Sequence, residues 1–192
     1  MALDVKTNYP WDGEVAISVT EAPAGEKALA LRVPGWCKKW TLTVNGEAVD
    51  AQPQDGYVSI KRAWRAGDVV SLSLDMPVKY VRSSPKVREN AGRVALMRGP
   101  VVYCLEEADN GDQLHLVRAG GPLTAKAAWQ PDLLGGIVAI ETAGVREKAA
   151  DWGETLYADC AAPEEEKATL KWIPYYAWAN RGVGEMRVWI RE

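Results

Sequence analysis

Apolar and polar residues alternate along most of this chain, in short runs that end at turn signals. Val15, Ile17 and Val19 form one such run, and a period of two predicts a strand that buries one face. Another run leads into Asn45-Gly46, a dipeptide that tolerates the positive φ angles of a tight hairpin turn. Roughly six to eight short strands fit into the first half, with turns about every 8 to 12 residues, which is the spacing of an antiparallel sandwich.

The second half of the chain repeats this organisation after the segment Ser83-Ser84-Pro85. Its strand candidates are residues 93–97, 100–106, 114–118, 137–145, 155–159, 168–173 and 185–191. No run with helical periodicity is long enough to predict a helix. We therefore predict an all-β fold of two antiparallel, jelly-roll-like β-sandwich domains packed together, with domain 1 at residues 1–85 and domain 2 at residues 86–192.

The charge balance and the apolar runs exclude two classes of partner. Lys and Arg number 23 and Asp and Glu 26, so the net charge is −3 and no nucleic-acid partner is expected. No apolar run approaches the roughly 18 residues of a membrane span, and the start lacks the cationic and apolar regions of a signal peptide. We expect a soluble protein without a signal peptide. Unpaired cysteines fit a reducing compartment, which favours the cytoplasm, and the oligomeric state stays open.

Metal and cofactor chemistry is not expected in this chain. Cys37, Cys104 and Cys160 are far apart, with no C-x-x-C pair, and His115 is the only histidine. A structural zinc ion needs four clustered ligands, and a Ser-His-Asp triad would depend on that one histidine. We predict that Cys104 is a small buried hydrophobe and that His115 points outward on a strand without a function.

The aromatic residues are unusual in kind, with nine Trp, seven Tyr and no Phe. Rings with a polar atom favour half-buried positions, such as sugar platforms and interfaces between domains. The alternative is that Trp fills the core in place of Phe.

Several strings of uncommon residues recur in one known family in the same order and spacing. They are Asn8-Tyr9-Pro10-Trp11-Asp12-Gly13, residues 31–37 (Leu-Arg-Val-Pro-Gly-Trp-Cys), residues 44–46, residues 56–58, Trp64, Gly67-Asp68, Met76-Pro77, residues 93–104 (Arg-Val-Ala-Leu-Met-Arg-Gly-Pro-Val-Val-Tyr-Cys) and residues 173–182 (Ile-Pro-Tyr-Tyr-Ala-Trp-Ala-Asn-Arg-Gly). Together they resemble the C-terminal part of glycoside hydrolase family 127, the β-L-arabinofuranosidase group, over nearly the whole chain.

The resemblance implies a non-catalytic role for this chain. Members of that family carry catalysis in a helical barrel, where a cysteine nucleophile lies within a zinc-thiolate and glutamate cluster, and β-sandwich domains follow the barrel. No stretch here matches the barrel motifs, so no catalytic or metal-binding role passes to Cys37, Cys104 or Cys160. The implied role is to support the helical-barrel catalytic domain, and the expected partner is that domain or a carbohydrate, such as an oligosaccharide of a plant polysaccharide.

Two aromatic groups are candidate carbohydrate-binding or docking residues. Trp36 and Trp40 flank a Cys-Lys-Lys segment after a Pro-Gly turn, and they either form a sugar platform or pack into the sandwich and against the missing barrel. The denser group is Tyr175, Tyr176, Trp178, Asn180 and Arg181. This group fits a glycan site, a surface that docks onto a catalytic domain, or part of the core.

Two other functions remain open beside the accessory role. One is a free-standing carbohydrate-binding module. The other is a small β-sandwich hydrolase, similar to the jelly-roll xylanases, that uses two glutamates across an aromatic cleft. Such a pair needs carboxyl groups roughly 5 to 5.5 Å apart for retention, or roughly 6.5 to 9.5 Å for inversion. Glu106 and Glu185 are the candidate pair, on strands expected to face each other.

Overall fold

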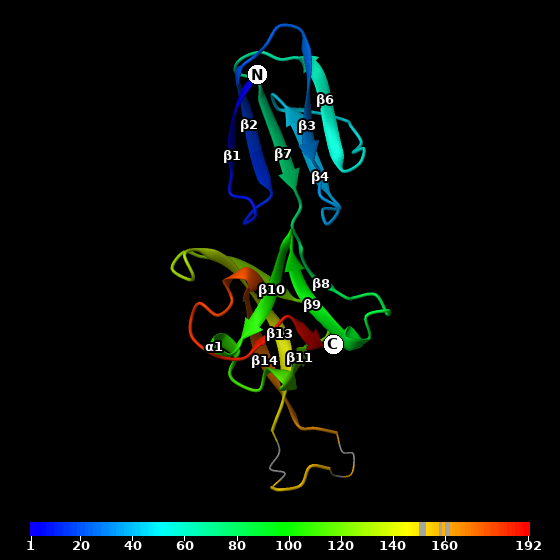
Figure 1. The fold of residues 1–192 in the computed structure, drawn as a ribbon, viewed down its shortest axis with the longest axis vertical. Helices are drawn as coiled ribbons and strands as arrows, with labels where there is room; N and C mark the ends of the chain where they lie inside the picture. Colours follow the sequence, from blue (N-terminus) through cyan, green and yellow to red (C-terminus); the bar gives the residue numbers. More distant parts are fainter. Residues whose placement is uncertain (150–152, 158, 160–161) are drawn as a thin grey trace. The chain divides into compact units, whose positions relative to one another are not determined.

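The computed structural model describes residues 1–149, 153–157, 159 and 162–192 (Figure 1). They form two compact units, Met1–Pro77 and Val78–Glu192. The expected boundary at residue 85 is therefore corrected to 77, because strand β8 (Val78–Val81) pairs with β9 (Arg93–Arg98) of the second unit. Of the strand candidate at 155–159, residues 155–157 and 159 are not in a strand and residue 158 lies outside the described residues, as does Cys160.

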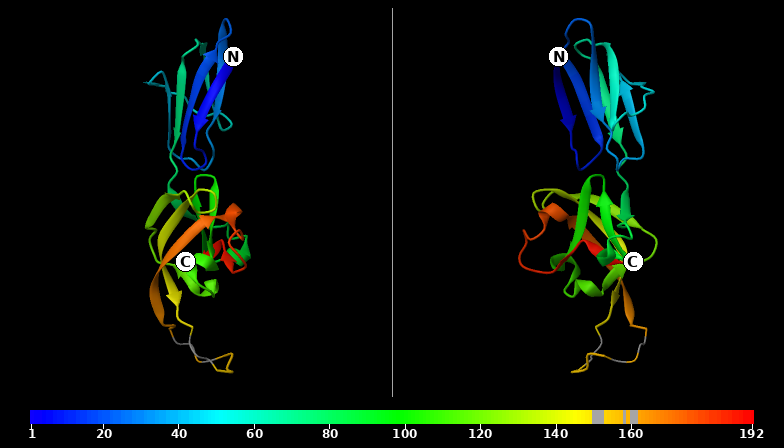
Figure 2. Two further views of the ribbon diagram at one scale, coloured as in Figure 1. Left: turned by 90° about the vertical axis from the view of Figure 1, so that its left-hand side faces the viewer. Right: turned by 45° about the vertical axis from the view of Figure 1, so that its right-hand side comes forward.

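Unit 1 consists of two antiparallel sheets. The larger sheet has the order β1-β2-β7-β4-β5, and the smaller one pairs β3 with β6. Their bounds are β1 (Ala2–Thr7), β2 (Glu14–Glu21), β3 (Glu26–Arg32), β4 (Trp40–Val44), β5 (Glu47–Ala48), β6 (Tyr57–Ala63) and β7 (Val69–Leu74). The two sheets lie face to face (Figure 2), as expected for a sandwich.

The core of unit 1 follows from the alternation in the sequence. Ile17 and Val19 of β2 are buried, and they share one hydrophobic cluster with Leu72 of β7 and with Val58 and Ile60 of β6. Because successive side chains of a strand point to opposite faces, one residue in two from each sheet enters this shared core.

Unit 2 forms a ring of hydrogen-bonded strands. Its strands are β8, β9, β10 (Val101–Glu106), β11 (Val117–Ala119), β12 (Ala125–Gln130), β13 (Ile137–Glu147), β14 (Glu165–Pro174), β15 (Met186–Arg187) and β16 (Trp189–Arg191). The order β10-β14-β13-β11-β16-β9 returns to β10, because β9 also pairs with β10. All these pairings are antiparallel except the single parallel pair of β11 and β16.

The prediction of an all-β fold is confirmed, and the second unit adds a detail to it. Where a jelly-roll-like sandwich was expected, six strands close on themselves as a small barrel. Closure removes free strand edges, which otherwise present unpaired N–H and C=O groups. The barrel core includes Trp172, which is fully buried and whose indole N–H donates to Thr142 Oγ1 at 2.9 Å.

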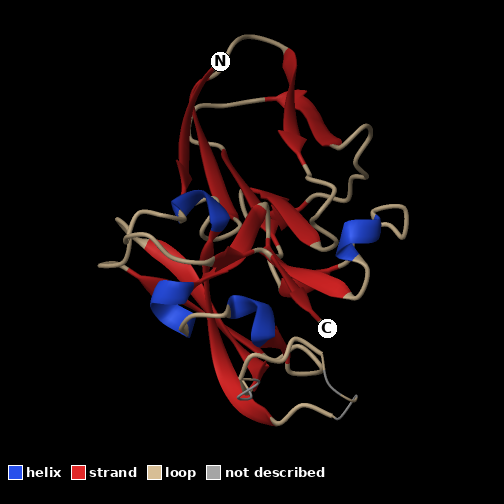
Figure 3. Cartoon of the chain, turned by 60° about the horizontal axis from the view of Figure 1, so that its bottom comes forward, coloured by secondary structure: helices blue, strands red, loops and turns tan. Residues whose placement is uncertain are grey.

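Helical structure in the described residues is limited to single turns (Figure 3). They are α1 (Glu107–Asn110) and the 3₁₀ turns η1 (Arg88–Asn90), η2 (Leu114–Leu116) and η3 (Tyr175–Ala177). His115 is exposed as predicted, but it lies on η2 and not on a strand. None of the helices in the described part of the chain has the length and apolarity to cross a membrane.

Gly13 provides a test of the sandwich in unit 1. A Cβ atom at residue 13 would lie 1.9 Å from the carbonyl oxygen of Leu74, and Leu74 N donates to Gly13 O at 3.0 Å. We expect Gly13→Ala to lower the free energy of unfolding by about 2 kcal/mol or more, because the backbones must separate. Gly35→Ala is the control, since a Cβ atom there meets nothing within 4 Å. Chemical denaturation measures both variants, and equal stabilities would contradict this account of Gly13.

Candidate functional site

An exposed group of aromatic rings follows β14 in unit 2. Pro174 ends the strand, and η3 then carries Tyr175 and Tyr176 into solvent, with exposed fractions of 45% and 65%. Trp178 follows at 42%, and its ring stacks on that of Tyr175 with centroids 6.4 Å apart and an interplanar angle of 6°. Ala177, between them, is buried. The sequence pattern thus brings three rings to one exposed turn, with a small residue as its anchor.

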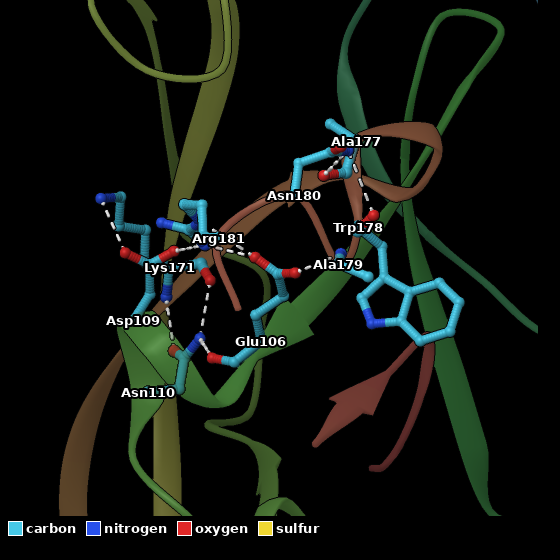
Figure 4. Close-up of polar contacts among 9 residues, drawn as sticks. All are labelled: Glu106, Asp109, Asn110, Lys171, Ala177, Trp178, Ala179, Asn180 and Arg181. Atoms are coloured by element: carbon cyan, nitrogen blue, oxygen red, sulfur yellow. Dashed lines mark hydrogen bonds and ion pairs between the residues drawn. The ribbon is translucent and has the colours of Figure 1, made fainter. Parts of the chain in front are cut away.

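Arg181 ties the loop after these rings to the end of β10 (Figure 4). Its Nε donates to Glu106 Oε2 at 3.1 Å and its Nη2 forms an ion pair with the same carboxylate. The same guanidinium donates to Asp109 Oδ2 at 2.5 Å. Ala179 N donates to the other oxygen of Glu106 at 2.9 Å. Since the side chain of Glu106 is 7% exposed, this is a nearly buried, well-bonded carboxylate.

Two amide side chains complete the support of the loop (Figure 4). Asn110 Nδ2 donates to the backbone oxygens of Glu106 and Lys171, each at 2.9 Å, and Asn110 Oδ1 accepts from Lys171 N at 2.9 Å. Asn180 Nδ2 donates to the oxygens of Ala177 and Trp178 at 3.0 and 3.3 Å. Asn180 therefore closes the turn beneath the rings, and its amide N–H groups are used within the protein.

Charge and burial set the protonation of this cluster. Burial raises the pKa of the Asp109 carboxyl, but hydrogen bonds from Arg181 and Lys171 outweigh it, so the pKa of Asp109 is lowered. The hydrogen bond between Arg181 and Asp109 raises the pKa of the Arg181 guanidinium. Burial, with a smaller contribution from the charge of Glu106, raises the pKa of the Cys104 thiol to about 12. A thiol of that pKa is almost wholly protonated at neutral pH, so Cys104 is no thiolate nucleophile.

The candidate pair Glu106 and Glu185 lies at one hollow of about 390 Å³, which Trp178 and Arg181 also line. Both carboxylates already accept hydrogen bonds from the protein. Glu106 accepts from Arg181 and Ala179, and Glu185 accepts from the backbone N–H groups of Gln113 and Leu114 at 3.1 and 2.8 Å. These contacts fit two structural carboxylates that hold loops in place, and the catalytic pair stays a prediction.

The other predicted residues lie in the first unit. Trp36 and Trp40 are half-buried and pack against the hydrophobic core of unit 1. Cys37, between them, is itself buried in that core. The aromatic candidates therefore belong to two separate units, and the structure brings only Tyr175, Tyr176, Trp178, Asn180 and Arg181 together.

The described residues do not fit a zinc-thiolate and glutamate cluster. Within the described ranges, no three His, Cys, Asp or Glu residues are grouped so that they could hold a metal ion. Cys37 and Cys104 are free, buried and in different units.

Sequence reasoning missed Asp109, Asn110 and Lys171. Asp109 and Asn110 lie next to the flagged Glu106 and share its acidic segment, which hinted at a basic partner. Their partner Arg181 is 72 residues away from Asp109 in the chain, and only the tertiary fold brings the two together.

The chain resembles known proteins in both units. Residues 78–191 match the glycoside hydrolase family 127 C-terminal domain, and residues 1–76 match the middle domain of the GH127 beta-L-arabinofuranosidases. A non-reducing end beta-L-arabinofuranosidase of Bifidobacterium longum is 42% identical over 202 residues, which span 100% of this chain and 30% of that protein.

Solved structures agree with this family assignment. The crystal structure of a GH127 beta-L-arabinofuranosidase from Geobacillus stearothermophilus T6 superposes with a TM-score of 0.93 at 46% identity, over 99% of this chain and 30% of that one. A second GH127 beta-arabinofuranosidase gives a TM-score of 0.85 at 34% identity, over 98% of this chain and 31% of that one. The chain thus spans less than a third of the length of these relatives.

The bond between Arg181 and its two carboxylates can be tested by unfolding. We expect Arg181→Gln to cost about 3 kcal/mol at neutral pH, because it leaves the nearly buried Glu106 carboxylate without its cation and Asp109 with Lys171 alone. The pKa of Asp109 is lower in the folded chain than in the unfolded chain, where it is about 3.9. The contribution of Asp109 to the free energy of unfolding is therefore fully present above pH 3.9 and is lost as the pH falls through the pKa of the folded chain. Urea titrations of the native chain and the variant should therefore converge in acid. Arg88→Gln, an exposed residue, is the matched control, and a constant difference across the pH range would contradict the prediction.

Proposed function

The chain belongs to glycoside hydrolase family 127, and from this premise we propose that it is the non-catalytic, β-rich part of a β-L-arabinofuranosidase-type enzyme. Its role is to support a helical-barrel catalytic domain. One observation carries the proposal: the chain matches the middle and C-terminal domains of the family and spans only 30% of a curated relative. The predicted cytoplasmic location stays a prediction.

The chemistry of the described residues is consistent with an accessory role. The carboxylates of the candidate pair accept hydrogen bonds from the protein, Glu106 from Arg181 and Glu185 from Leu114 N. The Cys104 thiol has a raised pKa and is fully buried. We therefore assign hydrolysis to the part of the enzyme outside this chain.

The exposed rings of η3 provide the surface for a partner. Tyr, Trp and Arg are enriched at the centres of protein interfaces, where they contribute most of the binding energy. Tyr176 and Trp178 are residues of this kind and are exposed to solvent, and Arg181 fixes their loop through its contacts with Glu106. We assign this surface to contact with the catalytic part of the enzyme.

A carbohydrate-binding module is the second candidate function, because the Tyr175 and Trp178 rings are stacked in parallel and more than 40% exposed. Parallel exposed rings offer a flat apolar face to a sugar ring. In this case a plant oligosaccharide is the partner in place of a protein surface.

The accessory role predicts that the purified chain releases no sugar from β-arabinofuranosides, xylosides or plant polysaccharides, with or without zinc and thiol. The measurement is reducing-sugar analysis after long incubation. Release that disappears in Glu106→Gln or Glu185→Gln would overturn the accessory role in favour of a small two-glutamate hydrolase.

Docking predicts that the chain stabilises the remainder of a family 127 enzyme in trans. The test adds it to the Geobacillus relative expressed without its matching segment, and measures the melting temperature and the affinity. We expect Trp178→Ser or Tyr176→Ser to weaken the affinity about tenfold or more, because aromatic anchors dominate interface energies. Tyr57→Ser, 45% exposed but in unit 1, is the control. A complex that tolerates all three substitutions equally would remove the η3 surface from the interface.

A further inference from the structure

A second hollow in unit 2 shares Glu185 with the first, but its other charged lining residues are arginines. It measures about 630 Å³ and is lined by Arg93, His115, Tyr175, Trp189 and residues 185–188. We propose that this hollow binds a sugar that carries a carboxylate, namely a uronic acid residue of an oligosaccharide. This goes beyond the supporting role proposed above, which does not require a ligand here.

The first observation is the state of two arginines. Arg93 and Arg187 are half-buried and line the hollow. Neither guanidinium has a hydrogen-bond or ion-pair partner among the residues that the structure describes. Buried charges are normally paired, and these two half-buried guanidinium groups have donors that are free to bind an anion.

Other arginines of similar burial in the same unit emphasise the contrast. Arg118 Nε donates to Glu165 at 2.9 Å. Arg146 Nη1 donates to the backbone oxygen of Asp112 at 2.8 Å, and Arg146 also donates to that of Asn110. Arg181 Nε donates to Glu106 at 3.1 Å, and Arg181 also donates to Asp109. The unit therefore satisfies its half-buried guanidinium groups elsewhere, and the two unpaired ones meet at one hollow.

The backbone holds these two arginines in place. Arg187 of β15 lies opposite Leu105 of β10, and Arg93 of β9 lies opposite Arg191 of β16. Sites on strands are positioned more firmly than sites on loops. The carboxylate of Glu185, which also borders the hollow, accepts the N–H groups of Gln113 and Leu114. The negative charge of Glu185 is therefore partly compensated by these N–H groups at the start of η2. The two guanidinium groups then give the hollow an excess of positive charge.

The aromatic residues point to a sugar as the carrier of the anion. Tyr175 lines this hollow, and its ring stacks on Trp178, which lines the 390 Å³ hollow beyond Glu185. Both volumes lie in the range of small-ligand sites, roughly 300 to 1,000 Å³. The stacked rings thus form an apolar path between the hollows. A short oligosaccharide would place its carboxylate at the arginines and its next ring against Tyr175 and Trp178.

The test compares an acidic ligand with its neutral methyl ester. We titrate the 192-residue chain with a galacturonic acid trimer and with its fully methyl-esterified form, by calorimetry at low and moderate salt. The acid trimer should bind at least tenfold more tightly, since charge-assisted bidentate hydrogen bonds to Arg are about twice as strong as neutral ones. Equal affinities, or no binding of either trimer, would overturn the proposal.

Variants locate the binding in the hollow. We expect Arg187→Gln and Arg93→Gln each to weaken the acid trimer about tenfold, and Arg187→Lys to weaken it less, because Lys keeps the charge but loses the planar fork. Tyr175→Ala should weaken both trimers. Arg88→Gln, with the same change of charge on an exposed turn, should bind as the native chain does. Circular dichroism checks that each variant is folded.

The outcomes are independent of the supporting role. The double variant Arg93→Gln with Arg187→Gln tests the anion site alone. If it binds the acid trimer as tightly as the native chain does, the proposed anion site is wrong, and the docking result is unaffected. Loss of stabilisation in trans with normal trimer binding would overturn the docking assignment alone.

Discussion

Strand β9 hydrogen-bonds to three other strands, and the closure of unit 2 depends on this sharing. Its first residues pair with β16 and its last residues with β10, while β8 occupies its other edge. Without β9 the ring of six strands would open at two edges. The hairpin between β9 and β10 fixes where β10 begins, and β10 then runs to Glu106, its last residue. The position of the candidate site is therefore a consequence of barrel closure.

The ion pair between Glu106 and Arg181 holds the loop after η3 against the end of β10. A nearly buried carboxylate at a strand end requires a cation, and the loop after η3 supplies it. Tyr175, Tyr176 and Trp178 lie in the turn that precedes Arg181 and are exposed, while Trp172 of β14 is buried.

Unit 2 thus carries the two surfaces for which we propose partners. The rings of η3 are the proposed contact with a protein or a sugar, and the hollow with Arg93 and Arg187 is the proposed anion site. Arg93 and Arg187 lie on paired strands, whereas the rings lie on η3 and the loop after it, which the contacts of Arg181 and Asn180 hold. The chain belongs to glycoside hydrolase family 127 and matches the middle and C-terminal domains of that family, which are about 30% of the length of its relatives.

Local patterns in the sequence determined the strands and most of the aromatic site. Alternation at Val15, Ile17 and Val19 predicted β2, because a period of two holds wherever one face of a strand is buried, and Tyr175 to Arg181 stood out by composition. The tertiary structure alone decided what lies far apart along the chain. The pairing of β9 with β16 and the ion pair of Arg181 with Asp109 join residues more than 70 positions apart. The boundary at residue 77 depends on the pairing of β8 with β9, and the unpaired state of Arg93 and Arg187 depends on what the fold places around them. No local propensity encodes such pairings, because they arise only when strand order and register are set.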